Sequence, residues 1–139
     1  MRVLLLLLLC SAGYAQTNTS IAEKTKAFKK YPGYFTWYWD AANGKIWLQV
    51  EKTNTEFLYV NSLPAGLGSN DIGLDRGQIG GTRIVYFNKV GKKLLLIQPN
   101  YDYRATSNSV KEQQAVKESF AQSVLWGFAI DAEQGDTLL

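Results

Sequence analysis

Two carboxylates and one guanidinium lie close together in a glycine-rich stretch of this sequence. Asp71, Asp75 and Arg76 fall within residues 64–81, which hold six glycines and little apolar periodicity. Two carboxylates in one loop can bind calcium or exchange protons with a substrate. Their spacing matches no EF-hand loop, however, and Arg76 is a ready counter-ion for Asp75. A structural loop is the better interpretation, with Asn70 and Asp71 forming turn hydrogen bonds.

The residue types that most enzymes depend on are missing. The sequence contains no histidine and a single cysteine, Cys10. Without imidazole there is no serine–histidine or cysteine–histidine pair, no histidine general base and no H-E-x-x-H zinc site. The glycines form no phosphate-binding loop, because G-K-[ST] and the G-x-G-x-x-G frame are both absent. We therefore expect no cofactor in this segment, and an independent enzyme based on Asp71 and Asp75 is the least favoured function.

Aromatic residues concentrate in residues 34–39 and recur at Trp47. Such a cluster could stack on a carbohydrate or a peptide, which makes Trp37, Trp39 and Trp47 the candidate aromatic face. Alternation along a strand puts Phe35, Trp37 and Trp39 on one side. Aromatic pairs also stabilise ordinary hairpins, so packing within a sheet is the simpler interpretation and a ligand platform is the alternative.

The N-terminal segment has the composition of a secretory signal. One positive charge is followed by a leucine run at residues 4–9 and by the small residues Gly13 and Ala15. The apolar run is shorter than the about 20 residues that span a bilayer. We predict cleavage between Ala15 and Gln16 and export to the periplasm or the exterior. Lipid modification at Cys10, or an N-terminal strand or helix, is the alternative.

Removal of residues 1–15 leaves one domain, residues 16–139, which is long enough to bury a core. The formal net charge is +3, and loss of Arg2 lowers it to +2. So small a charge argues against nucleic-acid binding as the main activity. No second apolar stretch is long enough for a transmembrane helix.

Alternating residues and turn signals predict an α+β fold, predominantly antiparallel β-sheet built from hairpins, with two helices. A capping box at Ser20 and Glu23 predicts a helix over residues 20–28, and Ser107 or Asn108 can cap a second helix that extends to Val124. The strands are expected at residues 34–39, 45–50, 56–63, 82–88, 93–98 and 125–130.

The last residues predict a further hairpin. Residues 133–136 form a turn signal, and the apolar residues 137–139 follow it. The expected partner of residues 137–139 is the strand at 126–130, which would leave that hairpin incomplete. We therefore expect the domain to be incomplete at its C-terminus; a short edge strand at a true C-terminus is the alternative.

The glycine-rich stretch also carries a resemblance. Residues 62–78, S-L-P-A-G-L-G-S-N-D-I-G-L-D-R-G-Q, resemble the N-terminal region of large secreted zinc-dependent metalloproteases of Bacteroidota-type bacteria. Residues 33–40, 98–100, 103–105 and 119–128 extend the resemblance over nearly all of the mature chain. In that family this region is a domain of unknown function ahead of the peptidase domain. The resemblance implies a downstream catalytic domain in which two histidines of H-E-x-x-H hold zinc and the glutamate activates water.

None of those catalytic residues has a counterpart in this chain, so only an accessory role carries over from the resemblance. The leading function is a non-catalytic accessory domain that packs on the catalytic domain of the same parent protein, with the peptide substrate as a further partner. Asn70, Asp71, Asp75 and Arg76 are the candidates for contacts across that boundary. The alternative is a self-standing secreted binding module that uses the aromatic face.

Overall fold

The computed structural model of the chain describes residues 19–66 and 70–139. The predicted signal, its cleavage site and Cys10 lie outside the described residues. The fold class is as predicted, because the strands pair in antiparallel fashion and two helices accompany them.

The first sheet has three antiparallel strands, β1 (Lys29–Tyr31), β2 (Thr36–Asp40) and β3 (Lys45–Gln49). The hairpin of β2 and β3 confirms the prediction, and Gly44 in its turn has a φ of 61°, which favours glycine. Strand β1 was not predicted. Its residues were expected only to end a helix, but they pair with β2 along their whole length.

The second sheet is a meander of β4 (Glu56–Ser62), β5 (Ile79–Val90), β6 (Lys93–Gln98) and β7 (Ser123–Ala129), in that order. Its register places Phe57 opposite Val85. Because side chains alternate between the faces of a sheet, these two residues share a face with the apolar residues that pack in the interior. We call this the core face; its residues include Phe57, Val85, Phe87, Leu94 and Leu96.

Both helices are shorter than predicted. Helix α1 covers Ile21–Thr25, and the Ser20 hydroxyl caps it as expected by accepting from the N–H of Glu23 at 3.2 Å. Helix α2 covers Val110–Ser119, and its cap is Ser109 rather than Ser107 or Asn108. The expected end at Val124 was wrong because residues 123 and 124 pair with β6, and this pairing overrides the helical spacing.

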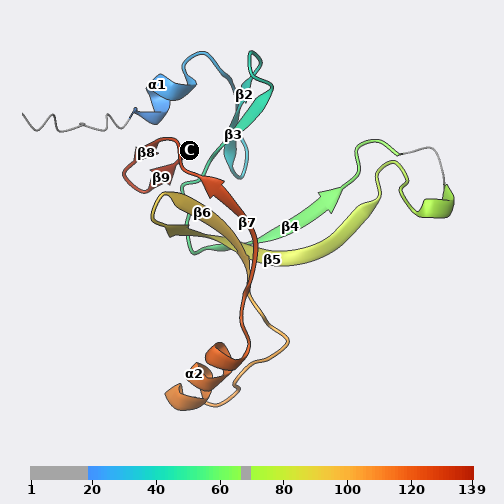
Figure 1. Ribbon diagram of the computed structural model, residues 1–139, viewed down its shortest axis with the longest axis vertical. Coiled ribbons are helices and arrows are strands. Elements are labelled where there is room, and N and C mark those ends of the chain that lie inside the picture. The colour runs from blue at the N-terminus through green and yellow to red at the C-terminus, as the bar shows by residue number, and fades with distance from the viewer. Residues whose placement is uncertain (1–18, 67–69) are drawn as a thin grey trace, which may run out of the picture.

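No helix within residues 19–66 and 70–139 has the length and apolar character needed to span a membrane. Helix α2 buries none of its residues, and Figure 1 shows it at one end of the molecule, apart from both sheets.

The C-terminal residues form a hairpin with a different partner from the one predicted. Strand β9 (Thr137–Leu138) pairs with β8 (Glu133–Gln134), not with β7. A two-residue turn containing Gly135, whose φ is 59°, joins these two strands directly. Leu138 also bridges to Val50, so the hairpin is tied to the residue that follows β3.

Two apolar clusters form the interior. The first packs the core face of the second sheet against the C-terminal hairpin, and its buried members are Val50, Val85, Phe87, Leu94, Leu96 and Leu138. The second lies between α1 and the first sheet, and its buried members are Ile21, Tyr38, Ala132 and Leu139. Figure 1 shows α1, the first sheet and the β8–β9 hairpin gathered at one end of the second sheet.

Replacement of Phe87 by alanine tests the first cluster. Phe87 is 4 % exposed, and its ring lies 5.5 Å from that of Phe35 and 5.3 Å from that of Phe57. Loss of this ring leaves a cavity, so the free energy of unfolding should fall by about 3–5 kcal/mol. Denaturant unfolding measures the change. Leu58→Ala is the control, since Leu58 is 68 % exposed, and it should change stability by less than about 0.5 kcal/mol. Equal losses in both variants would contradict this assignment of the core.

Candidate functional site

The glycine-rich loop lies at the far end of the ribbon made by β4 and β5, away from both apolar clusters (Figure 1). Its one helical turn, η1, covers Asn70–Ile72. Residues 67–69 and the side chain of Asn70 are outside the described part. Asp71, Asp75 and Arg76 are exposed, and no hydrogen bond or ion pair involves their side chains within the described chain. The expected Asp75–Arg76 pair and the expected turn hydrogen bond of the Asp71 side chain are therefore not formed.

Backbone contacts hold this loop instead. The N–H of Leu63 donates to the carbonyl of Gln78 at 3.0 Å, and the N–H of Gly77 donates to the carbonyl of Leu63 at 2.8 Å. A Cβ on Gly66 would lie 2.7 Å from the backbone nitrogen of Arg76, so only glycine fits there without a shift of the chain. The loop thus presents its charged side chains outward from a defined backbone.

Within residues 19–66 and 70–139, no group of three or more histidine, cysteine, aspartate or glutamate side chains is placed to hold a metal ion. Asp71 and Asp75 have no third ligand beside them in that part of the chain.

The loop conformation should depend on Gly66. We expect Gly66→Ala to push apart the segments at residues 66 and 76 and to raise the rate of proteolysis within residues 64–81 several-fold. Limited proteolysis with mass spectrometry measures the rate. Gly81→Ala is the matched control, because nothing lies within 4 Å of a Cβ at that position. If both variants were cleaved at the rate of the parent chain, the close approach at Gly66 would not hold the loop.

The three candidate tryptophans do not share one face. In the β2–β3 register, Trp37 lies opposite Leu48 and Trp39 opposite Ile46, whereas Trp47 lies opposite Tyr38. Since directly opposed residues point to the same side of a sheet, Trp47 is on the other face from Trp37 and Trp39. The predicted combination of these tryptophans into one aromatic face was wrong, because Trp47 lies opposite Tyr38, which is on the other face from Trp37 and Trp39.

Ring contacts involve both faces of the first sheet. Trp47 stacks on Phe28 at a centroid distance of 6.1 Å, and the Lys24 ammonium lies 4.8 Å from its ring centre. On the other face, Trp37 stacks on Tyr31 of β1 at 4.0 Å. These contacts place Trp37 and Trp47 in packing within and against the sheet.

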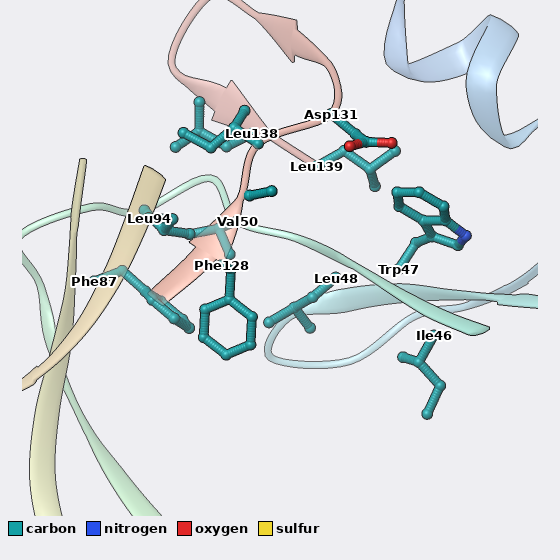
Figure 2. A pocket seen from close by; sticks show the side chains of 12 residues that line it. Ile46, Trp47, Leu48, Val50, Phe87, Leu94, Phe128, Asp131, Leu138 and Leu139 are labelled. Atoms are coloured by element: carbon teal, nitrogen blue, oxygen red, sulfur yellow. The ribbon is translucent and has the colours of Figure 1, made fainter. Parts of the chain in front are cut away.

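An apolar groove of about 480 Å³ lies between the first sheet, the core face of the second sheet and the C-terminal hairpin (Figure 2). Exposed Ile46 and Leu48 of β3 form one wall and Phe128 of β7 belongs to the other. We call it the apolar groove, and its lining residues are Ile46, Trp47, Leu48, Val50, Phe87, Leu94, Phe128, Ala129, Ile130, Asp131, Leu138 and Leu139.

The groove is lined almost wholly by apolar side chains. Its single ionisable lining residue, Asp131, forms an ion pair with Lys24 of α1 at 2.9 Å. None of its lining residues is a nucleophile with an adjacent base. A concave apolar surface with few polar groups binds an apolar side chain or ligand by the hydrophobic effect.

Asp40 is the buried carboxylate of the first sheet, only 3 % exposed. It accepts from Asn43 twice, from the side-chain amide at 2.7 Å and from the backbone N–H at 3.1 Å. These bonds, the side-chain one first, lower the pKa of Asp40 although desolvation opposes them. The Trp47 side chain also contributes to the lowered pKa, yet its buried indole N–H has no partner of hydrogen-bonding geometry within the described residues.

The lowered pKa of Asp40 sets the sign of a pH effect. Because the folded pKa lies below the ordinary value of 3.8, the ionised carboxylate stabilises the fold above that pH, and this contribution disappears as the pH falls through the lowered pKa. Asp40→Asn should therefore lower the melting temperature at about pH 7, and this deficit should shrink as the pH falls below 3.8. Thermal unfolding across this range measures it. The exposed Asp136→Asn is the control, and a pH-independent deficit in Asp40→Asn would contradict the mechanism.

Sequence reasoning missed the contacts that fix residues 99–106, for which it predicted no helix or strand. The Tyr101 hydroxyl donates to the Glu56 carboxylate of β4, and this bond raises the pKa of Tyr101. Tyr103 stacks on Phe120 at 3.8 Å, next to the end of α2. In the sequence, the tyrosines at alternate positions 101 and 103 could have indicated that this segment makes defined contacts. The apolar groove was missed as well, since its walls come from distant segments.

Comparison with known proteins gives one match. Residues 77–139 match the family described as a domain of unknown function (DUF5117). That stretch holds all of β5, β6, α2 and β7–β9. Searches of the curated proteins and of the solved structures gave no match. The match agrees with the expected domain of unknown function.

Proposed function

We propose that this chain is a non-catalytic accessory domain that packs on another protein domain. The observation that carries the proposal is the second face of the four-stranded sheet, opposite the core face. We call it the outer face. Its exposed apolar residues are Leu58 at 68 %, Val60 at 42 %, Ile84 at 43 %, Val90 at 55 % and Val124 at 58 % exposed.

An antiparallel sheet that faces water normally carries polar residues on its outer side. Here both sides of β4 and β5 are apolar: Phe57 and Val85 face the core, and Leu58 and Ile84 face outward. A sheet with two apolar faces needs a layer against each of them. Exposed apolar residues on adjacent strands, such as Leu58 and Ile84, mark an interaction site. A second layer from another domain would complete the sheet.

Two further features favour a partner. Helix α2 buries none of its ten residues, and Val110 at its start is 78 % exposed. The glycine-rich loop presents Asp71, Asp75 and Arg76 without partners in the described chain. A guanidinium holds a carboxylate or backbone carbonyls across an interface well, so Arg76 is the residue most suited to such a contact.

The partner that we propose is the one that the resemblance of residues 62–78 indicates. It is the catalytic domain of a secreted zinc-dependent metalloprotease, part of the same parent protein, with the zinc ligands and the catalytic glutamate on that domain. The proposal includes export, with the N-terminal signal removed near Ala15, and contact with the peptide substrate as a further role.

A second candidate is a self-standing secreted binding module. The apolar groove favours it, together with the exposure of Ile46 at 66 % and Leu48 at 36 %. Trp37 and Trp39 share that face of the first sheet with these two residues. The accessory function requires a catalytic domain in the same parent protein, whereas the binding module does not.

The parent gene separates the candidates. The accessory role requires an open reading frame that continues past Leu139 and encodes H-E-x-x-H. The purified parent should bind zinc and cleave casein in a chelator-sensitive manner, whereas this chain alone should do neither, because it has no histidine. A stop codon after Leu139, or zinc-dependent cleavage by this chain alone, would overturn the proposal.

Variants on the outer face and the loop locate the contact. Ile84→Lys and Arg76→Ala should each lower the melting temperature or the activity of the parent protein, because they place a charge at an apolar boundary or remove a polar contact. Both side chains are exposed, so the isolated chain should keep its melting temperature within about 2 °C. Lys52→Ala, at an exposed position between β3 and β4, is the control for a general loss of surface charge. Equal destabilisation of the parent and the isolated chain would mean that the residues serve only their own fold.

A further inference from the structure

Among the described strands, β7 is an open edge of the four-stranded sheet, since it ends the strand order and pairs with β6 alone. Natural proteins protect such edges with charged residues, proline, bulges or very short strands. Apart from the register shift opposite Leu96 and Ile97, β7 has none of these. Its seven residues, Ser-Val-Leu-Trp-Gly-Phe-Ala, carry no charge and no proline. Trp126 is 64 % exposed and Phe128 42 % exposed.

The hydrogen-bond phase of β7 shows which backbone groups point outward. The N–H of Ile130 donates to the carbonyl of Lys92 at 3.1 Å, so Ile130 faces β6 with its backbone groups. In an antiparallel pair such positions alternate with positions whose backbone groups point away. The pairing of Trp126 with Leu96 and of Phe128 with Leu94 runs without a shift through this stretch. Gly127 and Ala129 therefore direct their N–H and carbonyl groups to the open edge.

We propose that a second copy of this chain pairs with this edge, in antiparallel orientation, about a two-fold axis at Gly127. The axis makes Gly127 of each copy a hydrogen-bonded pair with its equivalent, which uses the outward backbone groups. It also sets Trp126 of each copy opposite Phe128 of the other. Two aromatic cross-strand pairs result, and the two sheets join into one.

The side chains on this edge suit a second copy. Trp126 and Phe128 lie on the core face of the sheet, because they pair with Leu96 and Leu94. Phe128 also lines the apolar groove. The two-fold arrangement therefore brings the exposed indole of one copy to the groove of the other, which is apolar and about 480 Å³ in volume. No charge on β7 opposes the approach of an identical strand.

The inference does not depend on the proposed accessory function. It uses the edge and the core face of the second sheet at β7, whereas the accessory role was argued from the outer face and the glycine-rich loop. A dimer can therefore exist with or without a catalytic partner. The contact is limited to one strand and a groove, so association should be reversible and dependent on concentration.

Sedimentation equilibrium of the purified chain, from about 1 µM to about 1 mM, tests the proposal. We expect a monomer–dimer equilibrium, and Trp126→Lys should raise the dissociation constant at least tenfold, since lysine at an edge opposes strand pairing. Leu58→Lys is the matched control: it also replaces an exposed apolar residue, at 68 %, on the opposite edge strand of the same sheet. It should leave the equilibrium unchanged. A monomer at every concentration, or equal dimerisation of Trp126→Lys, overturns the proposal.

A cysteine at the axis tests the register independently of Trp126. In a Cys10→Ser background, Gly127→Cys should form a disulfide-linked dimer under mild oxidation, because Cα atoms of a hydrogen-bonded pair lie about 5.5 Å apart, within disulfide range. The new Cβ would meet only the tip of Leu95, at 3.3 Å. Leu58→Cys in the same background is the control and should cross-link at least tenfold more slowly. Equal rates for the two variants would exclude the two-fold at Gly127.

Discussion

The structure depends on one backbone bridge, between Val50 and Leu138. The N–H of Val50 donates to the carbonyl of Leu138 at 2.8 Å, and the N–H of Leu138 donates back at 2.9 Å. Both side chains are nearly inaccessible, at 1 % and 2 %. Val50 follows the first sheet and packs on the second, while Leu139 belongs to the cluster under α1. The bridge thus fastens both clusters to each other, and the walls of the apolar groove meet there.

Local patterns predicted the hairpins well and the long-range pairs poorly. Residues 93–98 were placed correctly, because a four-residue turn signal with Gly91 precedes an unbroken apolar run. Strand β1 was missed because Lys29–Tyr31 has no strand pattern of its own and is formed by pairing with β2. The partner of Thr137 was also wrong: a two-residue turn at Gly135 closes a local hairpin at lower entropic cost than a return to residues 126–130.

The candidate site was even less accessible from sequence. Alternation within β2 assigned Trp37 and Trp39 to one face correctly, but the position of Trp47 depends on the register across the hairpin. A shift of one residue reverses the face of every side chain, so a sequence cannot place Trp47 without that register. The groove combines residues near 47, 90, 129 and 138, and its existence follows only from the Val50–Leu138 bridge.

The distribution of buried apolar surface explains why the edge strand β7 and the outer face are left uncovered by the described residues. Burial of apolar surface contributes about 25 cal/mol per Å², and strands β4 and β5 gain it on the core face, where Val85 is fully inaccessible. Leu58 and Ile84 on the reverse of the same strands, and Trp126 at the edge, retain apolar area that no described residue covers. Such area destabilises nothing in the isolated fold, but it makes association favourable for any surface of matching shape. The outer face is broad and suits a second layer, whereas the edge has directed backbone groups and suits a strand. The two surfaces of the second sheet therefore select different kinds of partner, and occupation of one leaves the other available.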